Sequence, residues 1–172
     1  MLNNTSNIVL IGMPGAGKST LGVVLAKILN YSFIDADLLI QGQCNKTLQK
    51  IIDACGPDGF IEVENEILCN LTADETVIAT GGSAVYSEEA MNHLAEIGTV
   101  VYLKVSLEEL ENRLGGLHER GVVMKNGIGM SLSDLYEERV PLYEKYAQIT
   151  INIDGLSVRD TARKLVDKLS MR

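Results

Sequence analysis

The stretch from Gly12 to Thr20, Gly-Met-Pro-Gly-Ala-Gly-Lys-Ser-Thr, constrains the fold most strongly, because it fits the phosphate-loop pattern G-x-x-x-x-G-K-[ST] at every fixed position. An apolar run at 7–11 precedes it, and a helical stretch at 20–29 follows it. Strand, loop and helix in that order are what a phosphate loop requires. The alternative, a glycine-rich turn that binds nothing, does not account for this context. The sequence therefore predicts a nucleoside triphosphate site.

Each position of the loop has a chemical use. The glycines let backbone N–H groups turn toward one anion at the start of a helix. Lys18 can neutralise the β and γ phosphates and is a candidate catalytic residue, and the short hydroxyl of Ser19 suits Mg²⁺. ATP and Mg²⁺ are therefore the expected cofactors. The candidate nucleotide-binding residues are Gly12, Pro14, Gly15, Ala16, Gly17, Lys18, Ser19 and Thr20.

Composition narrows the class of protein. With 172 residues, 46% hydrophobic and 22% charged, the chain is expected to form one globular domain over residues 1–172. A net charge of -8 argues against a nucleic acid partner. Three cysteines without C-x-x-C spacing favour free thiols, and the first apolar run is too short for a signal or membrane segment. We expect a cytoplasmic monomer that acts on a small molecule.

Apolar runs and helical patterns alternate along the chain. Strands are expected at 7–11, 31–34, 76–79, 99–105 and 149–153. Helices are expected between them, with a break at 55–58 and a kink or restart at Pro141. This alternation predicts an α/β fold of the P-loop NTPase type with a five-stranded parallel sheet between two helical layers.

Two carboxylates, Asp35 and Asp37, follow the second strand at i and i+2, at the sheet edge where ligands bind. Asp35 stands where a Mg²⁺ shell needs an anion. The alternative is that either aspartate only caps the helix that begins near Leu38.

Two further segments contribute candidates. Gly81 and Gly82 follow the third strand and allow close backbone approach to a ligand, although a plain turn is an equal alternative. Residues 115–129 hold five glycines and no regular period, which predicts a mobile lid. Arg120 in this lid can close on the transferring phosphoryl group, unless it is only a solvated loop arginine.

Over nearly the whole length, these residues resemble the shikimate kinases, whose fold is that of the nucleoside-monophosphate kinases. Five features carry the resemblance: the phosphate loop, the run 33–37, the Gly81–Gly82 pair, the arginines Arg113 and Arg120 that bracket the lid, and the element 138–143 (Glu-Arg-Val-Pro-Leu-Tyr). The resemblance implies an ATP-dependent phosphotransferase that acts on an alcohol group in aromatic amino acid biosynthesis.

The resemblance also implies roles. Arg113 would lie along the adenine, and Asp35 would support Mg²⁺ through water. Asp37 would grip the hydroxyls of the acceptor and take the proton from the attacking one, and Arg139 would bind its carboxylate. Gly81 and Gly82 would present backbone to the acceptor.

Three departures concern the acceptor and the lid. Ile61 stands where the family has an arginine that pairs with Arg139 on the shikimate carboxylate, while the acidic Glu64 remains. Ser83 replaces a third glycine, and the lid reads Arg-Gly-Val-Val from Arg120 in place of Arg-Pro-Leu. Loss of one side of a buried charged pair typically costs about 2 to 5 kcal/mol.

Shikimate is therefore the leading acceptor, and a different small hydroxy acid or polyol is the alternative. Two readings from other classes stay open. One is a non-catalytic nucleotide-binding regulator derived from a kinase. The other is a nucleotide or nucleoside kinase, for which two phenylalanines and no tryptophan offer little to bind a second base.

Overall fold

A computed structural model describes residues 7–114 and 130–171 of the chain. Five parallel strands form one sheet in the order β2-β3-β1-β4-β5. Their bounds are β1 Asn7–Ile11, β2 Ser32–Asp35, β3 Thr76–Ala79, β4 Gly98–Lys104 and β5 Ile149–Asn152. Each strand lies within two residues of the range that the sequence predicts, and the parallel α/β sheet is confirmed.

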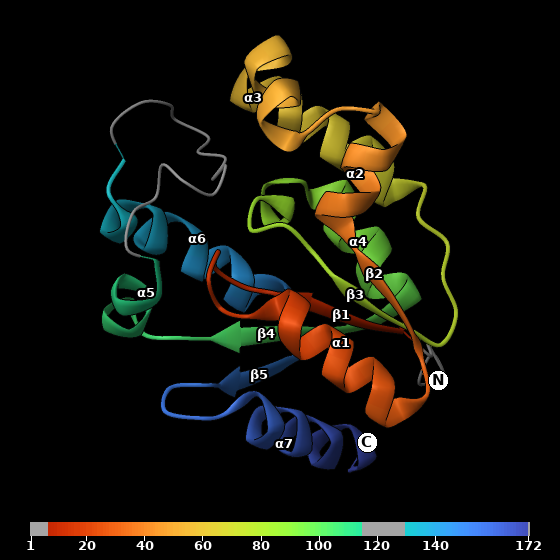
Figure 1. Cartoon of the computed structure of the whole chain (residues 1–172), viewed down its shortest axis with the longest axis vertical. Coiled ribbons are helices and arrows are strands. Elements are labelled where there is room, and N and C mark those ends of the chain that lie inside the picture. Colours follow the sequence, from red (N-terminus) through yellow and green to blue (C-terminus); the bar gives the residue numbers. More distant parts are fainter. Residues whose placement is uncertain (1–6, 115–129, 172) are drawn as a thin grey trace.

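Helices cover both faces of this sheet (Figure 1). They are α1 Lys18–Leu29, α2 Ala36–Cys44, α3 Leu48–Cys69, η1 Ala84–Tyr86, α4 Glu88–Ile97, α5 Leu107–Leu114, α6 Leu132–Tyr146 and α7 Val158–Ser170. Helices α1 and α7 pack against each other, whereas α4 and α6 contact β4. Right-handed crossovers explain why the helices are divided between the two faces. The connection from β1 to β2 runs in one direction along the sheet and the connection from β3 to β4 runs in the other, so their helices lie on opposite faces.

The main core lies along the central strands. All five residues of β1 are buried, as are all four of β3. Continuous burial fits strands with helices on both faces. A smaller apolar cluster lies between α2 and α3 and contains Ile40, Ile51, Phe60 and Ile67.

Two helix boundaries differ from expectation. The predicted break at 55–58 is a single non-helical residue, Gly56 (φ 74°, ψ 173°), within α3. The predicted restart at Pro141 is wrong, because α6 continues through it as one helix. Pro141 itself is exposed, whereas Leu135, Arg139 and Tyr143 of the same helix are buried, and this packing outweighs the local preference of proline.

The sheet order brings three chain segments to one edge. β1 lies between β3 and β4. It connects toward β2, whereas β3 and β4 connect toward the opposite edge of the sheet, which makes the carboxyl end of β1 a topological switch point. The phosphate loop follows β1, Asp35 ends β2, and Thr80 follows β3. The predicted lid, 115–129, lies outside the described residues, so the single domain with a lid stays a prediction.

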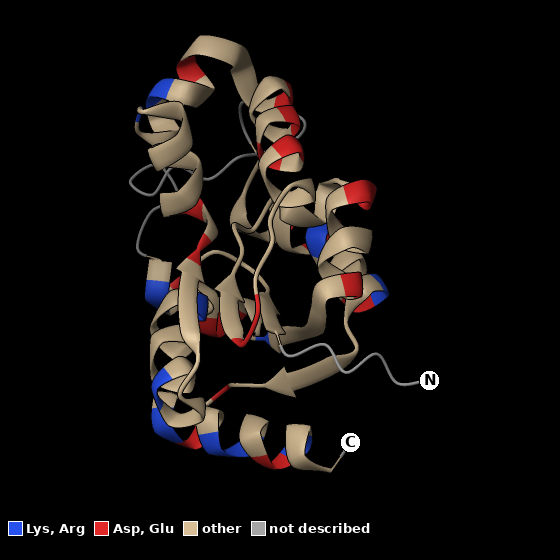
Figure 2. Ribbon diagram, turned by 90° about the vertical axis from the view of Figure 1, so that its right-hand side faces the viewer, with Lys and Arg blue, Asp and Glu red and all other residues tan. Residues whose placement is uncertain are grey.

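Charged residues of both signs lie on the helices that the structure describes. Figure 2 shows acidic and basic positions mixed along the ribbon of α7, the helix that ends at the C-terminus. In α7, Arg159 and Asp160 are neighbours, and Lys168 follows Asp167. None of the described helices has the length and apolar character to cross a bilayer.

Candidate active site

The phosphate loop closes around the amino group of Lys18. Its Nζ donates to the carbonyl oxygens of Gly12 at 2.7 Å and Met13 at 2.9 Å, and only 8% of the residue is exposed. Burial lowers the pKa of this amine to about 8, although Asp37 opposes that shift. Gly15 and Gly17 have φ of 83° and 88°, in the region that favours glycine. The sequence therefore folds here into a turn that aims the start of α1 into the site.

Asp35 has two separate contacts. Its Oδ1 accepts from the backbone N–H groups of Asp37 (3.0 Å) and Leu38 (3.3 Å), which makes it the N-cap of α2. Its Oδ2 accepts from the hydroxyl of Ser19 at 2.7 Å. The capping alternative is thus correct for Asp35, and the same side chain also joins β2 to the phosphate loop.

Ser19 and Asp35 suit a divalent cation. Ser19 lies at the start of α1 and Asp35 at the end of β2, and both offer hard oxygen atoms. In such sites, Mg²⁺ is held by one or two protein oxygens together with phosphate oxygens and water. Among the described residues, no three His, Cys, Asp or Glu side chains cluster into a metal site.

A cavity of about 300 Å³ opens beside the loop. It is lined by Lys18 and Ser19 of the phosphate loop together with Asp37 and Arg139. Further lining residues are Pro14, Gly15, Gly17, Thr20, Leu48, Phe60, Thr80, Gly81, Gly82 and Ser83. The fold therefore joins most of the predicted nucleotide and acceptor residues in one cavity.

The glycine pair after β3 is needed for close packing. A Cβ on Gly81 would lie 2.8 Å from Oδ1 of Asp37 and 2.9 Å from Oε2 of Glu64. A Cβ on Gly82 would lie 2.6 Å from Nη1 of Arg139. Real side-chain carbons do not approach other atoms so closely, so three charged groups converge on a turn without side chains.

Glu64 is a buried acid behind that turn. It is 0% exposed, its Oε1 accepts from the hydroxyl of Ser83 at 2.7 Å, and its Oε2 has no hydrogen-bond partner within the described part of the chain. Burial raises its pKa to about 7; the Ser83 bond opposes the shift and Asp37 adds to it. Burial also raises the pKa of Asp37, and Asp35 adds to that shift.

Arg139 is held by aromatic residues. It is 1% exposed, and its Nε donates to the hydroxyl of Tyr86 at 3.1 Å, with the guanidinium 5.2 Å from the centre of that ring. Tyr143, one turn further along α6, donates to the carbonyl of Gly82 at 2.8 Å. Sequence reasoning assigned no role to either tyrosine. The spacing of four residues between Arg139 and Tyr143 was a usable signal, whereas nothing marked Tyr86.

Several predicted site residues do not line the main cavity. Ile61 packs beside the small apolar cluster and lines a separate surface hollow with Glu62 and Asn65, not the main cavity. Gly12 accepts a hydrogen bond from Lys18 through its carbonyl, and Ala16 lines a small cavity together with Arg113. Arg120 lies outside the described residues.

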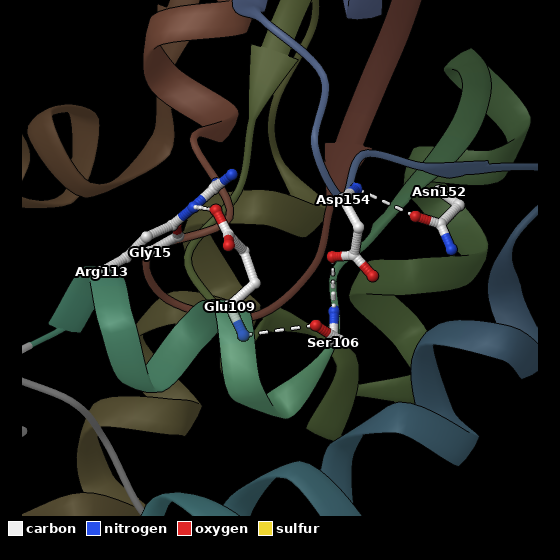
Figure 3. A network of polar contacts seen from close by, with 6 residues as sticks. All are labelled: Gly15, Ser106, Glu109, Arg113, Asn152 and Asp154. Carbon is white, nitrogen blue, oxygen red and sulfur yellow. Dashed lines mark hydrogen bonds and ion pairs between the residues drawn. The ribbon is translucent and has the colours of Figure 1, made fainter.

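Arg113 approaches the loop from α5 (Figure 3). Its Nη1 donates to the carbonyl of Gly15 at 3.4 Å, and its Nε pairs with Glu109 at 2.8 Å. The apolar cavity that it lines, about 60 Å³, also contacts Ile153 and Leu156 of the loop after β5. An arginine over an apolar hollow beside the phosphate loop suits a flat aromatic base.

Fold and site together define a class. A parallel sheet with a phosphate loop at its switch point and a cavity that a buried lysine, an aspartate and an arginine line together is the arrangement of a P-loop kinase for small molecules. A gluconokinase from Sinorhizobium meliloti shares this fold at a TM-score of 0.53 and 17% identity, over 97% of both chains. That likeness concerns the fold alone.

The family follows from closer similarity. The family model for shikimate kinase matches residues 14–170, and the chain belongs to this family. A shikimate kinase of Vibrio parahaemolyticus is 36% identical over 167 residues, which is 96% of this chain and 97% of that protein. The structure of a shikimate kinase from Acinetobacter baumannii in complex with shikimate has a TM-score of 0.88 and 32% identity, covering 98% of this chain and 95% of the other. The chain is therefore an ATP- and Mg²⁺-dependent phosphotransferase with an alcohol acceptor.

Proposed function

We propose that this protein transfers the γ-phosphoryl group of ATP to a hydroxyl group of shikimate. The single observation that carries this proposal is that Lys18, Asp37 and Arg139 line one cavity of about 300 Å³. One end of the cavity suits phosphates and the other suits a small hydroxylated acid. The shikimate-bound relative supports the choice of acceptor.

The protein groups act by positioning and charge. Lys18 leaves its two loop carbonyls to contact the β and γ phosphates, and the N–H groups at the start of α1 bind the same anion. Ser19 and Asp35 would hold Mg²⁺, which supplies positive charge between the phosphates. Arg113 would lie against the adenine. Arg120 would close on the phosphates from the lid.

The chemical step is an in-line displacement. The acceptor oxygen forms its bond to the γ-phosphorus while the bond between that phosphorus and the oxygen bridging to ADP breaks. The hydroxyl proton goes to Asp37, whose raised pKa makes it a stronger base than an exposed aspartate. Arg139 would hold the acceptor carboxylate, and Gly81 and Gly82 would contact the acceptor through backbone atoms.

A different hydroxylated acceptor is the second candidate, and the position of Ile61 favours it. Where the family has a second arginine, this chain packs an aliphatic side chain outside the cavity. Glu64 and Ser83, behind and beside the glycine turn, would then set the acceptor preference. Among the residues that the structure describes, Arg139 is the one arginine that lines this pocket, where an acidic acceptor is expected to meet two.

A coupled ADP-release assay with Mg-ATP tests the proposal, run on shikimate beside a panel of hydroxy acids, sugars and polyols. Saturable turnover with shikimate supports it. Turnover only with another compound would replace shikimate by that acceptor. No turnover with any acceptor, combined with intact ATP binding, would favour a nucleotide-binding regulator.

The proposal also concerns location, oligomeric state and nucleic acid binding. We propose that the protein works in the cytoplasm as a monomer and without a nucleic acid partner. The net charge of -8 and the mixed charges of the described helices support the last point. Sedimentation of the full chain at micromolar concentration tests the monomer, and a dimer would contradict it.

A further inference from the structure

Arg113 is fixed from two directions before any nucleotide arrives. Its Nε pairs with Oε1 of Glu109, four residues earlier on α5, at 2.8 Å. Its Nη1 reaches the carbonyl of Gly15 at 3.4 Å. The guanidinium is therefore directed at the phosphate loop by an acid on its own helix (Figure 3).

The start of α5 is anchored as well. The N–H of Ser106 donates to Oδ1 of Asp154 at 2.9 Å, and the N–H of Glu109 donates to the hydroxyl of Ser106 at 3.2 Å. Asp154 is itself ordered by a bond from its N–H to Oδ1 of Asn152 at 2.9 Å. Glu109 is thus held at its backbone by this turn, while its side chain holds Arg113.

Arg113 and the loop after β5 border the same hollow. Arg113 lines the small apolar cavity from α5, and Ile153 and Leu156 line it from the loop that contains Asp154. A base that enters between them meets walls already tied to one another through Ser106 and Glu109. The packing of Leu114 against Gly15 adds a further contact between the end of α5 and the phosphate loop.

The pair with Glu109 contributes little to folding. Both side chains are about one-third exposed (31% and 36%), and pairs of this kind have small effects on stability because water screens them. Its effect on binding is different. A free arginine side chain has many rotamers, and ordering it on a ligand reduces affinity, so an arginine already held in place binds better.

We propose that Glu109 is a positioning residue for nucleotide binding: it holds the Arg113 guanidinium beside the base-binding hollow through its contact with Nε. The inference rests on the proposed ATP site and adds a residue that does not touch the nucleotide. Glu109 acts through Arg113, and the Ser106–Asp154 contact keeps the helix that carries both in register with the loop after β5.

The test is the dissociation constant of a fluorescent ADP analogue, measured without acceptor on the full chain. Glu109→Gln should weaken binding about threefold to tenfold, the range expected for releasing one long side chain. Glu111→Gln is the matched control, because Glu111 is an exposed acid of the same helix. It reports the general effect of removing one negative charge near a polyanion, which should leave binding unchanged or slightly tighter.

A double-mutant cycle separates this role from a general structural one. In the Arg113→Ala background, Glu109→Gln should cause no further loss, because its only route to the nucleotide is gone. In turnover assays, Glu109→Gln should raise KM for ATP and leave KM for the acceptor unchanged. An unchanged dissociation constant for Glu109→Gln would overturn the inference, as would an equal loss in the Arg113→Ala background. Absence of nucleotide binding by the unaltered protein would instead overturn the proposed function on which it rests.

Discussion

Ser83 donates a hydrogen bond to Oε1 of Glu64 at 2.7 Å, and the other carboxyl oxygen of Glu64 has no hydrogen-bond partner among the described residues. The acid lies against Gly81, beside Asp37, with no exposed surface. Ser83 is one of the positions where the family resemblance implies a departure near the acceptor, and its hydroxyl bonds this carboxyl group directly. This relationship links the acceptor pocket to the stability of the protein.

The pH dependence of stability should report Glu64. The folded protein holds a proton on this group up to about pH 7, whereas the unfolded chain loses it near pH 4.5. Unfolding therefore releases a proton between these values, and this group lowers the free energy of unfolding as pH rises from 4.5 to 7. In Glu64→Gln, the contribution of this group to the fall in the free energy of unfolding disappears. The variant should be more stable than the unaltered protein at pH 8 by up to about 3 kcal/mol, and similar to it at pH 4.5.

Urea denaturation of the two proteins at pH 4.5, 6 and 8 measures this difference. Ser83→Ala serves as a comparison, because it removes the bond that favours the charged carboxylate and should steepen the fall in stability. A difference between Glu64→Gln and the unaltered protein that stays constant with pH would contradict the assignment.

Ile61→Arg should improve the binding of an acidic acceptor. Position 61 follows Phe60, which lines the main cavity, so an arginine there would add positive charge near the acceptor end of the site. The KM for shikimate should fall about tenfold or more, with KM for ATP unchanged. Ile61→Met, which is long but uncharged, should not reproduce the effect. Steady-state kinetics measure both KM values. An unaltered shikimate KM in Ile61→Arg would contradict the prediction that positive charge at position 61 improves binding of the acceptor.

Lys18→Ala should abolish useful turnover with every acceptor. The amine is the buried cation of the phosphate loop, and loss of such charge stabilisation typically costs roughly a hundredfold to a thousandfold in rate. Folding should survive, since the substitution removes a charge whose burial is unfavourable. The ADP-release assay and a thermal melt are measured together. A folded variant with a substantial kinase rate would refute the assignment of the site.

Asp35 allows its two contacts to be separated. Asp35→Asn should keep the cap of α2, because asparagine and aspartate are equally good N-caps, and so stability should change little. The charge next to Ser19 is lost, so the Mg²⁺ concentration needed for half-maximal activity should rise roughly tenfold or more. Asp35→Ala should lose the cap too, at about 1 kcal/mol. Titration of Mg²⁺ at saturating ATP, together with chemical denaturation, distinguishes the two effects; an unchanged Mg²⁺ requirement in both variants would exclude Asp35 from the metal site.

Much of the site could be predicted because its chemistry lies within short segments. The phosphate loop and the run from Asp35 to Asp37 each carry their own local signal, since a loop, a strand end and a cap are set by neighbours in the chain. The position of Pro141 shows the limit of such signals. Its local preference predicts an interruption, but the buried face of α6 keeps the helix continuous.

The sequence by itself determined the succession of strands and helices along the chain, the phosphate loop at Gly12–Thr20 and the identity of the charged candidates. These depend on periodicity and on spacing along the chain. Tertiary structure alone decided which of them meet. It placed Glu64 behind Gly81, directed Ile61 away from the cavity, and joined Tyr86 to Arg139 across 53 residues of sequence. Such contacts depend on how helices pack on a sheet, and local sequence preferences do not encode that packing.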